Sequence, residues 1–236
     1  MDLIPSAALA ATLGPASAGY AAAAGWLAGR LRTRRGVRTA YTRKVFHFLI
    51  FTAAAGVHLL WGLPGVALFG GVTSLAVLYA VMRGAGFPFY EAMARPGDAP
   101  HRTLFILVPL ATTALGGLTS NLLFGDLAFI GYLVAGWGDA VGEPVGARWG
   151  RHRYRVPSLA GVPATRSLEG SAAVWLVGTL AAALGLAALG LPLATLIGVA
   201  LACGTAGALV EAFSSHGLDN FTVQVAAALL AWLLLS

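Results

Sequence analysis

Two acidic residues stand four positions apart in the apolar, glycine-rich stretch from Gly136 to Gly150. They are Asp139 and Glu143, and a helix would carry both on one face. An acidic side chain at membrane depth costs about 2.5–3.5 kcal/mol on insertion scales, so by default it marks a functional position. Mg²⁺ prefers one or two carboxylates together with phosphate oxygens. This stretch therefore predicts a site for a divalent metal and a phosphate.

Other polar residues supply what such a site still needs. Transfer of a phosphoryl group requires cationic side chains, and Arg148 and Arg166 follow the acidic pair in a basic loop. A helix expected to begin near Ser167 would offer free N–H groups to an anion. An attacking hydroxyl group needs a base or correct positioning, and Asp139 is the candidate for either role.

Three sets of candidate residues follow from these requirements. The candidate catalytic residues are Asp139, Glu169, Lys44 and His47. The candidate metal ligands are Asp139, Glu143, Glu169, Glu211 and Asp219. The candidate nucleotide and phosphate contacts are Arg43, Gly138, Gly142, Gly146, Arg148, Arg166, Ser167, Gly170, Ser171 and Asn220. Most of them lie at the expected ends of apolar segments, so we expect them to share one depth.

Each of these features also has a structural explanation. Glycines spaced four apart in an apolar helix more often form a packing face than a phosphate-binding loop. His47 has the position of an interfacial histidine, and the run from Arg151 to Arg155 could act by electrostatic attraction alone. A packing face does not require two acids so close together, so Asp139 and Glu143 favour the functional explanation.

The composition identifies the class of protein that must position these residues. Of the 236 residues, 58% are hydrophobic and 10% are charged, and the mean hydropathy is +0.79. A soluble domain has about 25% charged residues, so we expect an all-α polytopic membrane protein. We expect one transmembrane catalytic domain over residues 1–236, in which residues 1–42 form a first span and a peripheral basic loop. The richness in alanine, glycine and arginine fits a bacterium with a GC-rich genome, and we expect the protein in the bacterial cytoplasmic membrane.

Eight apolar segments are long enough to cross a bilayer. Their ranges are 6–29, 45–61, 64–82, 103–119, 122–142, 171–189, 191–210 and 219–235. The boundary of the fifth segment depends on Pro144, which disfavours helical geometry at Glu143. We therefore expect the fifth helix to stop at that position.

The basic residues give the expected orientation. All fifteen Lys and Arg residues fall in three loops, with seven between spans one and two, three between spans three and four, and five between spans five and six. In an eight-span arrangement these loops lie on one side, which the positive-inside rule assigns to the cytoplasm. Both termini are then outside, and the active site is at the cytoplasmic face. Because the charges sit in short loops, the basic balance indicates membrane lipids and a soluble anion rather than nucleic acid.

Four separated elements resemble the family of CTP-dependent lipid-alcohol kinases, which includes phytol, farnesol and dolichol kinases and the yeast-type diacylglycerol kinase. The matching elements are Arg43-Lys44-x-x-His47, Gly138-Asp139-Ala140-x-Gly142 continuing to Gly146 and Gly150, Ser167-Leu168-Glu169-Gly170-Ser171, and Glu211 with Asp219-Asn220-Phe221-Thr222-Val223. They occur in the family's order, and the resemblance covers residues 43 to 235.

The resemblance implies transfer of the γ-phosphate of a nucleoside triphosphate, usually CTP, to a membrane-embedded alcohol with a divalent metal such as Mg²⁺. Many relatives have a small or apolar residue at the position of Glu143, so a metal role for Glu143 is a physical inference only. The short chain favours a shorter isoprenoid alcohol, such as phytol or geranylgeraniol, over dolichol.

Two other functions fit part of the pattern. A lipid cytidylyltransferase of the CDP-diacylglycerol synthase type would also consume CTP but would release pyrophosphate. The dense Asp-rich terminal signature of that group is not found here. A small cation- or proton-coupled transporter would carry acids near the bilayer midplane and internal repeats. Here the acids cluster toward one face.

Overall fold

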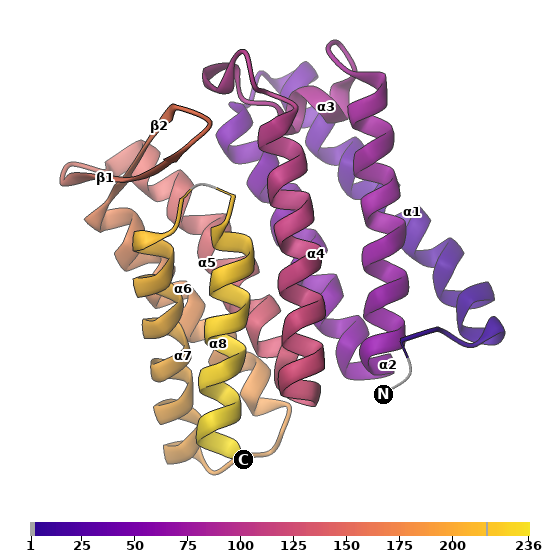
Figure 1. Ribbon diagram of the computed structural model, residues 1–236, viewed down its shortest axis with the longest axis vertical. Helices are drawn as coiled ribbons and strands as arrows, with labels where there is room; N and C mark the ends of the chain where they lie inside the picture. Colours follow the sequence, from indigo (N-terminus) through magenta and orange to yellow (C-terminus); the bar gives the residue numbers. More distant parts are fainter. Residues whose placement is uncertain (1–2, 216) are drawn as a thin grey trace. The chain divides into compact units, whose positions relative to one another are not determined.

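The computed structural model describes residues 3–215 and 217–236, and helices make up most of it (Figure 1). The chain divides into two compact units, Met1–Leu110 and Ala111–Ser236. The boundary falls inside a helix, α4 (Leu104–Phe124).

The first unit is built from two long helices and a short one. Its elements are α1 (Ala7–Arg35), α2 (Thr39–Arg83), α3 (Pro88–Met93) and the 3₁₀ turn η1 (Pro96–Asp98). The long helix α2 changes direction at Gly62, whose φ of 59° and ψ of −150° are not helical. The nearby Pro64 adds to this break because its ring cannot continue the hydrogen-bond ladder. The two halves of α2 therefore correspond to two of the expected apolar segments.

Close contacts with α3 fix the beginning of α2. The hydroxyl of Thr39 donates to the carbonyl of Glu91 over 3.2 Å, and that of Thr42 donates to the carbonyl of Ala92 over 2.8 Å. A Cβ atom on Gly25 of α1 would lie 2.9 Å from the ring of Phe89, so α1 approaches α3 closely. These contacts anchor the turn of α2 that carries the basic motif.

The second unit holds the last part of α4 and the remaining elements. They are the 3₁₀ turn η2 (Gly125–Leu127), α5 (Ala128–Trp149), β1 (Arg153–Leu159), β2 (Val162–Ser167), α6 (Leu168–Ala187), α7 (Leu193–Phe213) and α8 (Asp219–Leu235). Helix α6 packs against α5 and α7, and α8 packs against α7 and α5, so these four helices form a bundle. The ends of α5, α7 and α8 thereby come within reach of one another.

The basic loop after α5 contains a β-hairpin, and Arg151, Arg153 and Arg155 are exposed there. Strands β1 and β2 are antiparallel, with Tyr154 opposite Arg166. The turn places Ala160 at φ 50° and Gly161 at φ 73°. Two left-handed residues in a two-residue connection match the twist of a hairpin. The hairpin is a small exception to the expected all-α fold, and it gives Arg166 a fixed position.

The expected end of the fifth helix at Glu143 is wrong, because α5 continues through Pro144 to Trp149. A proline removes only one hydrogen bond of the ladder, and the α region is disfavoured rather than forbidden for the residue before it. The helix then ends where the N–H of Gly150 donates to the carbonyl of Gly146 over 3.0 Å. The glycine-rich stretch is thus helical from Gly136 to Trp149.

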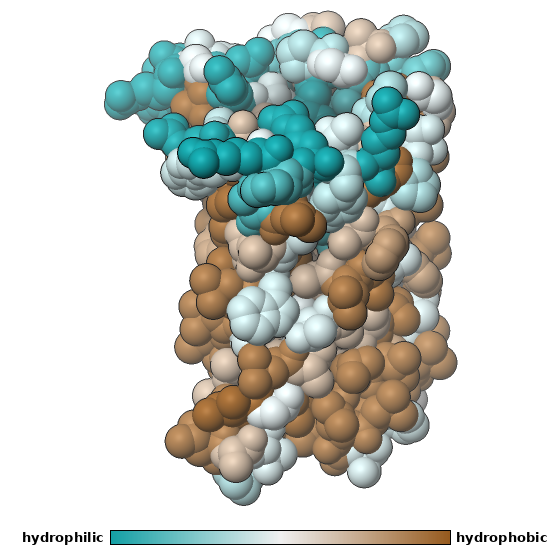
Figure 2. Space-filling model, turned by 90° about the vertical axis from the view of Figure 1, so that its left-hand side faces the viewer, coloured by the Kyte–Doolittle hydropathy of each residue, from teal (hydrophilic) through white to brown (hydrophobic). Residues whose placement is uncertain are grey.

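The helices have the character of membrane spans. In the described part of the chain, four continuous helical stretches are long and apolar enough to cross a bilayer by length and composition. They are Thr39–Arg83, Leu104–Trp149 (which runs through α4, η2 and α5), Leu168–Ala187 and Leu193–Phe213. On the face seen in Figure 2, hydrophilic side chains gather at one end, and apolar side chains predominate over the rest. Each expected apolar segment overlaps a helix. The number of crossings and the side of each terminus stay predictions.

Candidate active site

Three carboxylates from three helices of the second unit converge. Asp139 comes from α5, Glu211 from the last turn of α7 and Asp219 from the first turn of α8. One oxygen of each lies within 4.8 Å of the others, and this is the group in the described chain that could hold a metal ion. Glu211 and Asp219 are each only 4% exposed. Burial of these two acids beside a third, half-buried one requires compensating charge.

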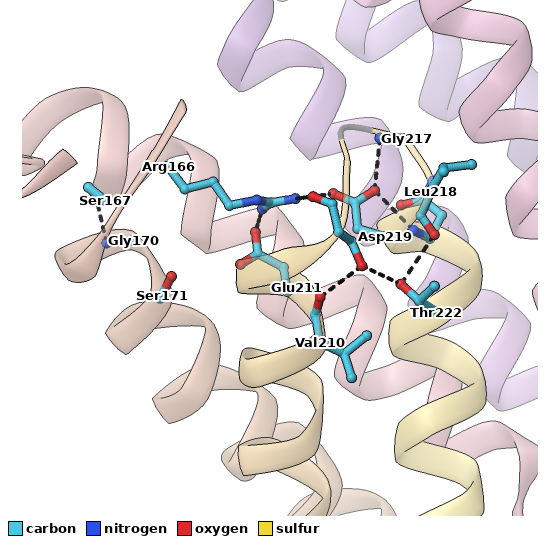
Figure 3. Close-up of polar contacts among 12 residues, drawn as sticks. Arg166, Ser167, Gly170, Ser171, Val210, Glu211, Gly217, Leu218, Asp219 and Thr222 are labelled. Carbon is cyan, nitrogen blue, oxygen red and sulfur yellow. Dashed lines mark hydrogen bonds and ion pairs between the residues drawn. The ribbon is translucent and has the colours of Figure 1, made fainter. Parts of the chain in front are cut away.

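Part of that compensation comes from Arg166 on β2 (Figure 3). Its Nη2 lies 2.8 Å from Oδ2 of Asp219, and its Nη1 is paired with Oε1 of Glu211. The same Nη2 donates to the carbonyl of Ser214 over 3.3 Å. The planar guanidinium therefore ties the hairpin to both ends of the α7–α8 connection, a geometry that the fork of an arginine suits.

The carboxylate of Asp219 is also held by the backbone. Its Oδ1 accepts hydrogen bonds from the N–H of Gly217 at 3.1 Å and of Asn220 at 3.0 Å. A hydrogen bond of 2.7 Å between the hydroxyls of Ser214 and Thr222 closes the connection from α7 to α8 (Figure 3). The orientation of Asp219 is thus set before any ligand arrives.

The net charge of the three acids and an available carboxylate oxygen both suit a divalent cation. With Arg166 they carry a formal charge of −2, which one divalent cation neutralises. Oε2 of Glu211 is buried and, within residues 3–215 and 217–236, has no hydrogen-bond partner. An unpaired carboxylate oxygen in a buried site is costly unless a cation or a donor binds it. Oxygen ligands of this kind are those that Mg²⁺ accepts.

The other two candidate metal ligands are not members of this group. Glu169, in the first turn of α6, accepts hydrogen bonds from the backbone N–H of His152, and its Oε1 is 2.8 Å from Nδ1 of that histidine. It therefore holds the start of β1. Glu143 is half-buried one helical turn beyond Asp139 and is not a member of the triad.

The serines of the sixth segment have local partners. Ser167 caps α6 by accepting a hydrogen bond of 3.1 Å from the N–H of Gly170. The hydroxyl of Ser171 is 2.7 Å from that of Tyr154 on β1. These contacts fasten the hairpin to α6, so they position Arg166. The exposed Arg148 lies over the ring of Trp149, with 5.2 Å from its Cζ to the ring centroid.

The glycines of α5 are in contact with α6. A Cβ atom on Gly138 would lie 3.1 Å from Cγ1 of Val174, and one on Gly146 would lie 3.0 Å from Oγ of Ser167. Gly170 faces them, since its Cβ would lie 2.9 Å from the carbonyl oxygen of Gly142. Packing thus explains the four-residue spacing, and a phosphate contact at these glycines stays a prediction. The close approach of α5 and α6 sets the position of Asp139.

The remaining candidates are Asn220 on α8 and three residues near the start of α2. Asn220 on α8 donates from Nδ2 to the hydroxyl of Thr113 over 2.9 Å, so it holds α8 against α4. Lys44 and His47 lie in the first unit, near the start of α2 with Arg43. The side chain of Lys44 is buried, and His47 stacks on Phe51 with 4.2 Å between ring centroids.

Comparison with known proteins identifies the family. Over 192 residues the chain is 30% identical to the phytol kinase of Synechocystis sp., and the match covers 81% of this chain and 78% of that protein. The chain belongs to the polyprenol and phytol kinase family. No family model and no solved structure matches it. Membership makes the chain a kinase that acts on a lipid alcohol.

Family membership agrees with the grouping of the motifs. Three of the four motif elements meet in the second unit, through Asp139, the β2–α6 segment and the pair Glu211 and Asp219. Arg166 is predicted from the sequence as a phosphate contact, and in the structure it pairs with two acids. No pattern in the sequence signals that pairing, because it depends on the hairpin register. The backbone contacts that orient Asp219 were missed for the same reason.

Proposed function

We propose that the protein transfers the γ-phosphate of CTP to a membrane-embedded isoprenoid alcohol, such as phytol or geranylgeraniol. The observation that carries this proposal is the convergence of Asp139, Glu211 and Asp219 on one buried point beside Arg166. A kinase of this family needs a nucleotide and a lipid alcohol. A negatively charged cluster with an unpaired buried oxygen is suited to a divalent cation that accompanies the triphosphate.

Asp139, Glu211 and Asp219 would hold this ion, which we take to be Mg²⁺. When bound, such an ion offsets the charge of the β- and γ-phosphates. Glu211 and Asp219 keep their orientation through Arg166 and through the backbone N–H groups at the start of α8. This preorganisation means that little energy is spent in ordering the ligands at the time of reaction.

The reaction would be an in-line displacement. The alcohol oxygen attacks the γ-phosphorus, the bond from that phosphorus to the bridging oxygen breaks, and CDP leaves. The hydroxyl proton passes to a carboxylate, for which half-buried Asp139 is the candidate. Arg166 lies beside the acids, so it would also stabilise the charge that develops on the transferred group.

The remaining assignments rest on the family resemblance. Arg43, Lys44 and His47 would contribute phosphate contacts and catalysis, and the Ser167 to Ser171 element would contribute to nucleotide binding. The site would face the cytoplasm in an eight-span protein with both termini outside, in a bacterial cytoplasmic membrane. The concentration of arginines in three loops supports this orientation.

The direct test is product analysis with the purified protein. The protein in detergent is incubated with γ-labelled CTP, Mg²⁺ and, in separate tubes, phytol, geranylgeraniol, dolichol or diacylglycerol. We expect label in the extracted lipid with phytol or geranylgeraniol. Parallel tubes with ATP and GTP measure the nucleotide preference.

Other outcomes have distinct meanings. Pyrophosphate released from CTP together with a CDP-lipid would replace the kinase with a cytidylyltransferase. Label in the lipid from ATP but not from CTP would agree with the kinase reaction and contradict CTP as the phosphate donor. Absence of turnover with every pair would overturn the proposed combination of nucleotide and alcohol.

A further inference from the structure

Two neighbouring threonines of α4 contact the beginning of α8 within the second unit. The hydroxyl of Thr112 donates to the backbone carbonyl of Gly217, and Nδ2 of Asn220 donates to the hydroxyl of Thr113 over 2.9 Å. Thr112 and Asn220 are buried. Asp219, a member of the acidic triad, lies between Gly217 and Asn220 in the sequence. Helix α4 therefore holds the chain on both sides of this acid.

The two helices also approach closely one turn further along. Gly116 follows Thr112 by four residues, so it lies on the same face of α4. A Cβ atom on Gly116 would lie 2.9 Å from Cα of Phe221 and 3.1 Å from the carbonyl oxygen of Asn220. The backbones of α4 and α8 are thus in contact there, and this contact fixes the positions from which the threonine hydroxyls reach α8.

The two residues that α4 holds are the same two that orient Asp219. The N–H groups of Gly217 and Asn220 both donate to Oδ1 of Asp219, at 3.1 Å and 3.0 Å. Gly217 has a φ of 92°, a conformation that glycine adopts far more readily than other residues. Each of these residues therefore makes one contact with α4 and another with the carboxylate, and the position of α4 is passed on to Asp219.

These contacts decide which part of the carboxylate can bind an ion. A carboxylate has about four acceptor sites. On Asp219, Oδ1 accepts two N–H groups and Oδ2 accepts Nη2 of Arg166 at 2.8 Å, so among the described residues about one site is left, on Oδ2. Its direction depends on the rotation of the carboxylate, which the two N–H groups restrain. Groups that orient a metal ligand in this way typically change metal affinity about 10–100-fold.

We propose that Thr112 and Thr113 are positioning residues for Asp219 as a cation ligand. Thr112 holds the carbonyl of Gly217 and Thr113 holds the side chain of Asn220, so the two N–H groups keep the carboxylate turned toward the other acids of the triad. Neither threonine contacts the cation itself. This role depends on the proposed function in one respect, the binding of a divalent cation by the three acids.

The test measures the binding of Mn²⁺ alone to the purified protein in detergent, from the loss of the free-ion EPR signal. Thr112→Val keeps the shape of the side chain but removes its hydroxyl, and we expect the dissociation constant for Mn²⁺ to rise about 10–100-fold. Thr113→Val removes the acceptor of Asn220 and should act in the same direction. Thr112→Ser keeps the hydroxyl and should bind Mn²⁺ as the wild type does.

Thr205→Val on α7 is the matched control. The hydroxyl of Thr205 accepts a hydrogen bond of 3.0 Å from Nε1 of Trp175 on α6, so its loss also removes a hydrogen bond between two helices. Trp175 is not a member of the acidic triad, and the control should bind Mn²⁺ as the wild type does. Melting temperatures without metal are measured alongside, because a threonine that only fastened α4 to α8 would lower the melting temperature and leave Mn²⁺ binding unchanged.

A dissociation constant in Thr112→Val equal to that of Thr205→Val overturns the proposal, and so does binding in Thr112→Ser as weak as in Thr112→Val. If Thr112→Val does not fold, the same comparison is made with Thr113→Val. Absence of Mn²⁺ binding in the wild type, or unchanged binding in Asp139→Asn, would overturn the cation site of the proposed function and this role with it. The measurement needs neither nucleotide nor alcohol, so it is decisive even if the proposed pair of substrates is wrong.

Discussion

Arg166 and Asp219 form an ion pair across 53 positions of the sequence, with 2.8 Å between Nη2 and Oδ2. Arg166 is on a hairpin strand and Asp219 begins the last helix, so the pair joins two segments that have no local reason to meet. The same guanidinium pairs with Glu211. The acidic cluster and the basic hairpin are therefore one unit of structure, and substitutions in either should affect both.

Replacing Asp139 should abolish turnover without unfolding the protein. Asp139→Asn keeps the shape of the side chain but removes its charge and its ability to accept a proton as a carboxylate. Loss of a general base or a metal ligand is expected to reduce kcat by about 10²–10⁴-fold. The measurement is label transfer from CTP to phytol, with the elution profile in detergent as a check of folding.

Asp126→Asn is the matched control for that substitution. Asp126 lies in η2, is exposed, and is not a member of the acidic triad. It should keep wild-type activity. Near wild-type turnover in Asp139→Asn would show that the assignment of Asp139 is wrong.

Replacing Arg166 should weaken both the site and the fold around it. Arg166→Gln leaves two buried carboxylates without their cation, and breaking a buried pair costs about 3–5 kcal/mol. Loss of one preorganised charge donor lowers kcat by about 10²–10³-fold. Arg166→Lys keeps the positive charge but not the planar, forked guanidinium. Its melting temperature and turnover should therefore lie between those of the wild type and Arg166→Gln. Melting temperature and turnover are measured together.

The control for Arg166 is Arg155→Gln on the same hairpin. Arg155 is exposed on β1, and its loss changes the net charge by the same amount. It should have little effect on the melting temperature. Equal losses in the two variants would mean that the hairpin acts through its total charge rather than through the ion pair.

The sequence predicts much of the helical framework, because apolar segments and helix-breaking residues are local signals. The acids Asp139, Glu211 and Asp219 could also be named in advance, since few acids occur in an apolar chain. What could not be predicted is which of them converge. In the sequence, Glu169 and Asp219 are both candidate metal ligands. In the structure, Glu169 instead contacts His152, which precedes the hairpin. That outcome depends on strand register, which no local pattern of charges encodes.

The glycine face of α5 provides a test of packing. A Cβ on Gly142 would overlap the side chain of Val174 and lie 3.4 Å from the carbonyl oxygen of Gly170. Gly142→Ala should therefore cost about 1–3 kcal/mol by overpacking. Val174→Ala removes the overlapping atoms, so the double variant should recover stability and activity. Gly198→Ala, in open space, should be neutral.

The two roles of these glycines predict different double variants. If Gly142 serves only packing, activity follows stability through the series. If its backbone binds phosphate, Gly142→Ala with Val174→Ala stays inactive although its melting temperature is restored. The KM for CTP is the deciding quantity in that case.

Glu91 on α3 should make the stability of the first unit depend on pH. Glu91 accepts hydrogen bonds from the N–H of Gly86 at 3.0 Å and from Nη2 of Arg102 at 2.8 Å. Partial burial raises the pKa of Glu91, but these two partners outweigh it and hold the pKa below its ordinary value of 4.5. A depressed pKa in the folded state means that ionised Glu91 stabilises the fold above pH 4.5. That contribution is lost as the pH falls through the folded value.

Glu91→Gln should therefore melt at a lower temperature than the wild type at pH 7. The difference should shrink as the pH falls below 4.5, because the wild-type carboxylate becomes protonated. Melting curves between pH 3 and 8 measure this, with Asp126→Asn as the control. A difference that stays constant over that range would mean that Glu91 acts through its shape and not its charge.

The orientation of α6 provides the last prediction. This helix of 20 residues spans about 30 Å, enough to cross the hydrocarbon core. In a Cys203→Ser background, single cysteines are placed at the exposed positions Ser158, on the hairpin, and Ala188, just after α6. The positive-inside rule predicts that an impermeant maleimide labels Ala188→Cys in intact cells and Ser158→Cys only in inverted vesicles. The reverse pattern would invert the orientation. Labelling of both from one side would mean that α6 does not cross the membrane.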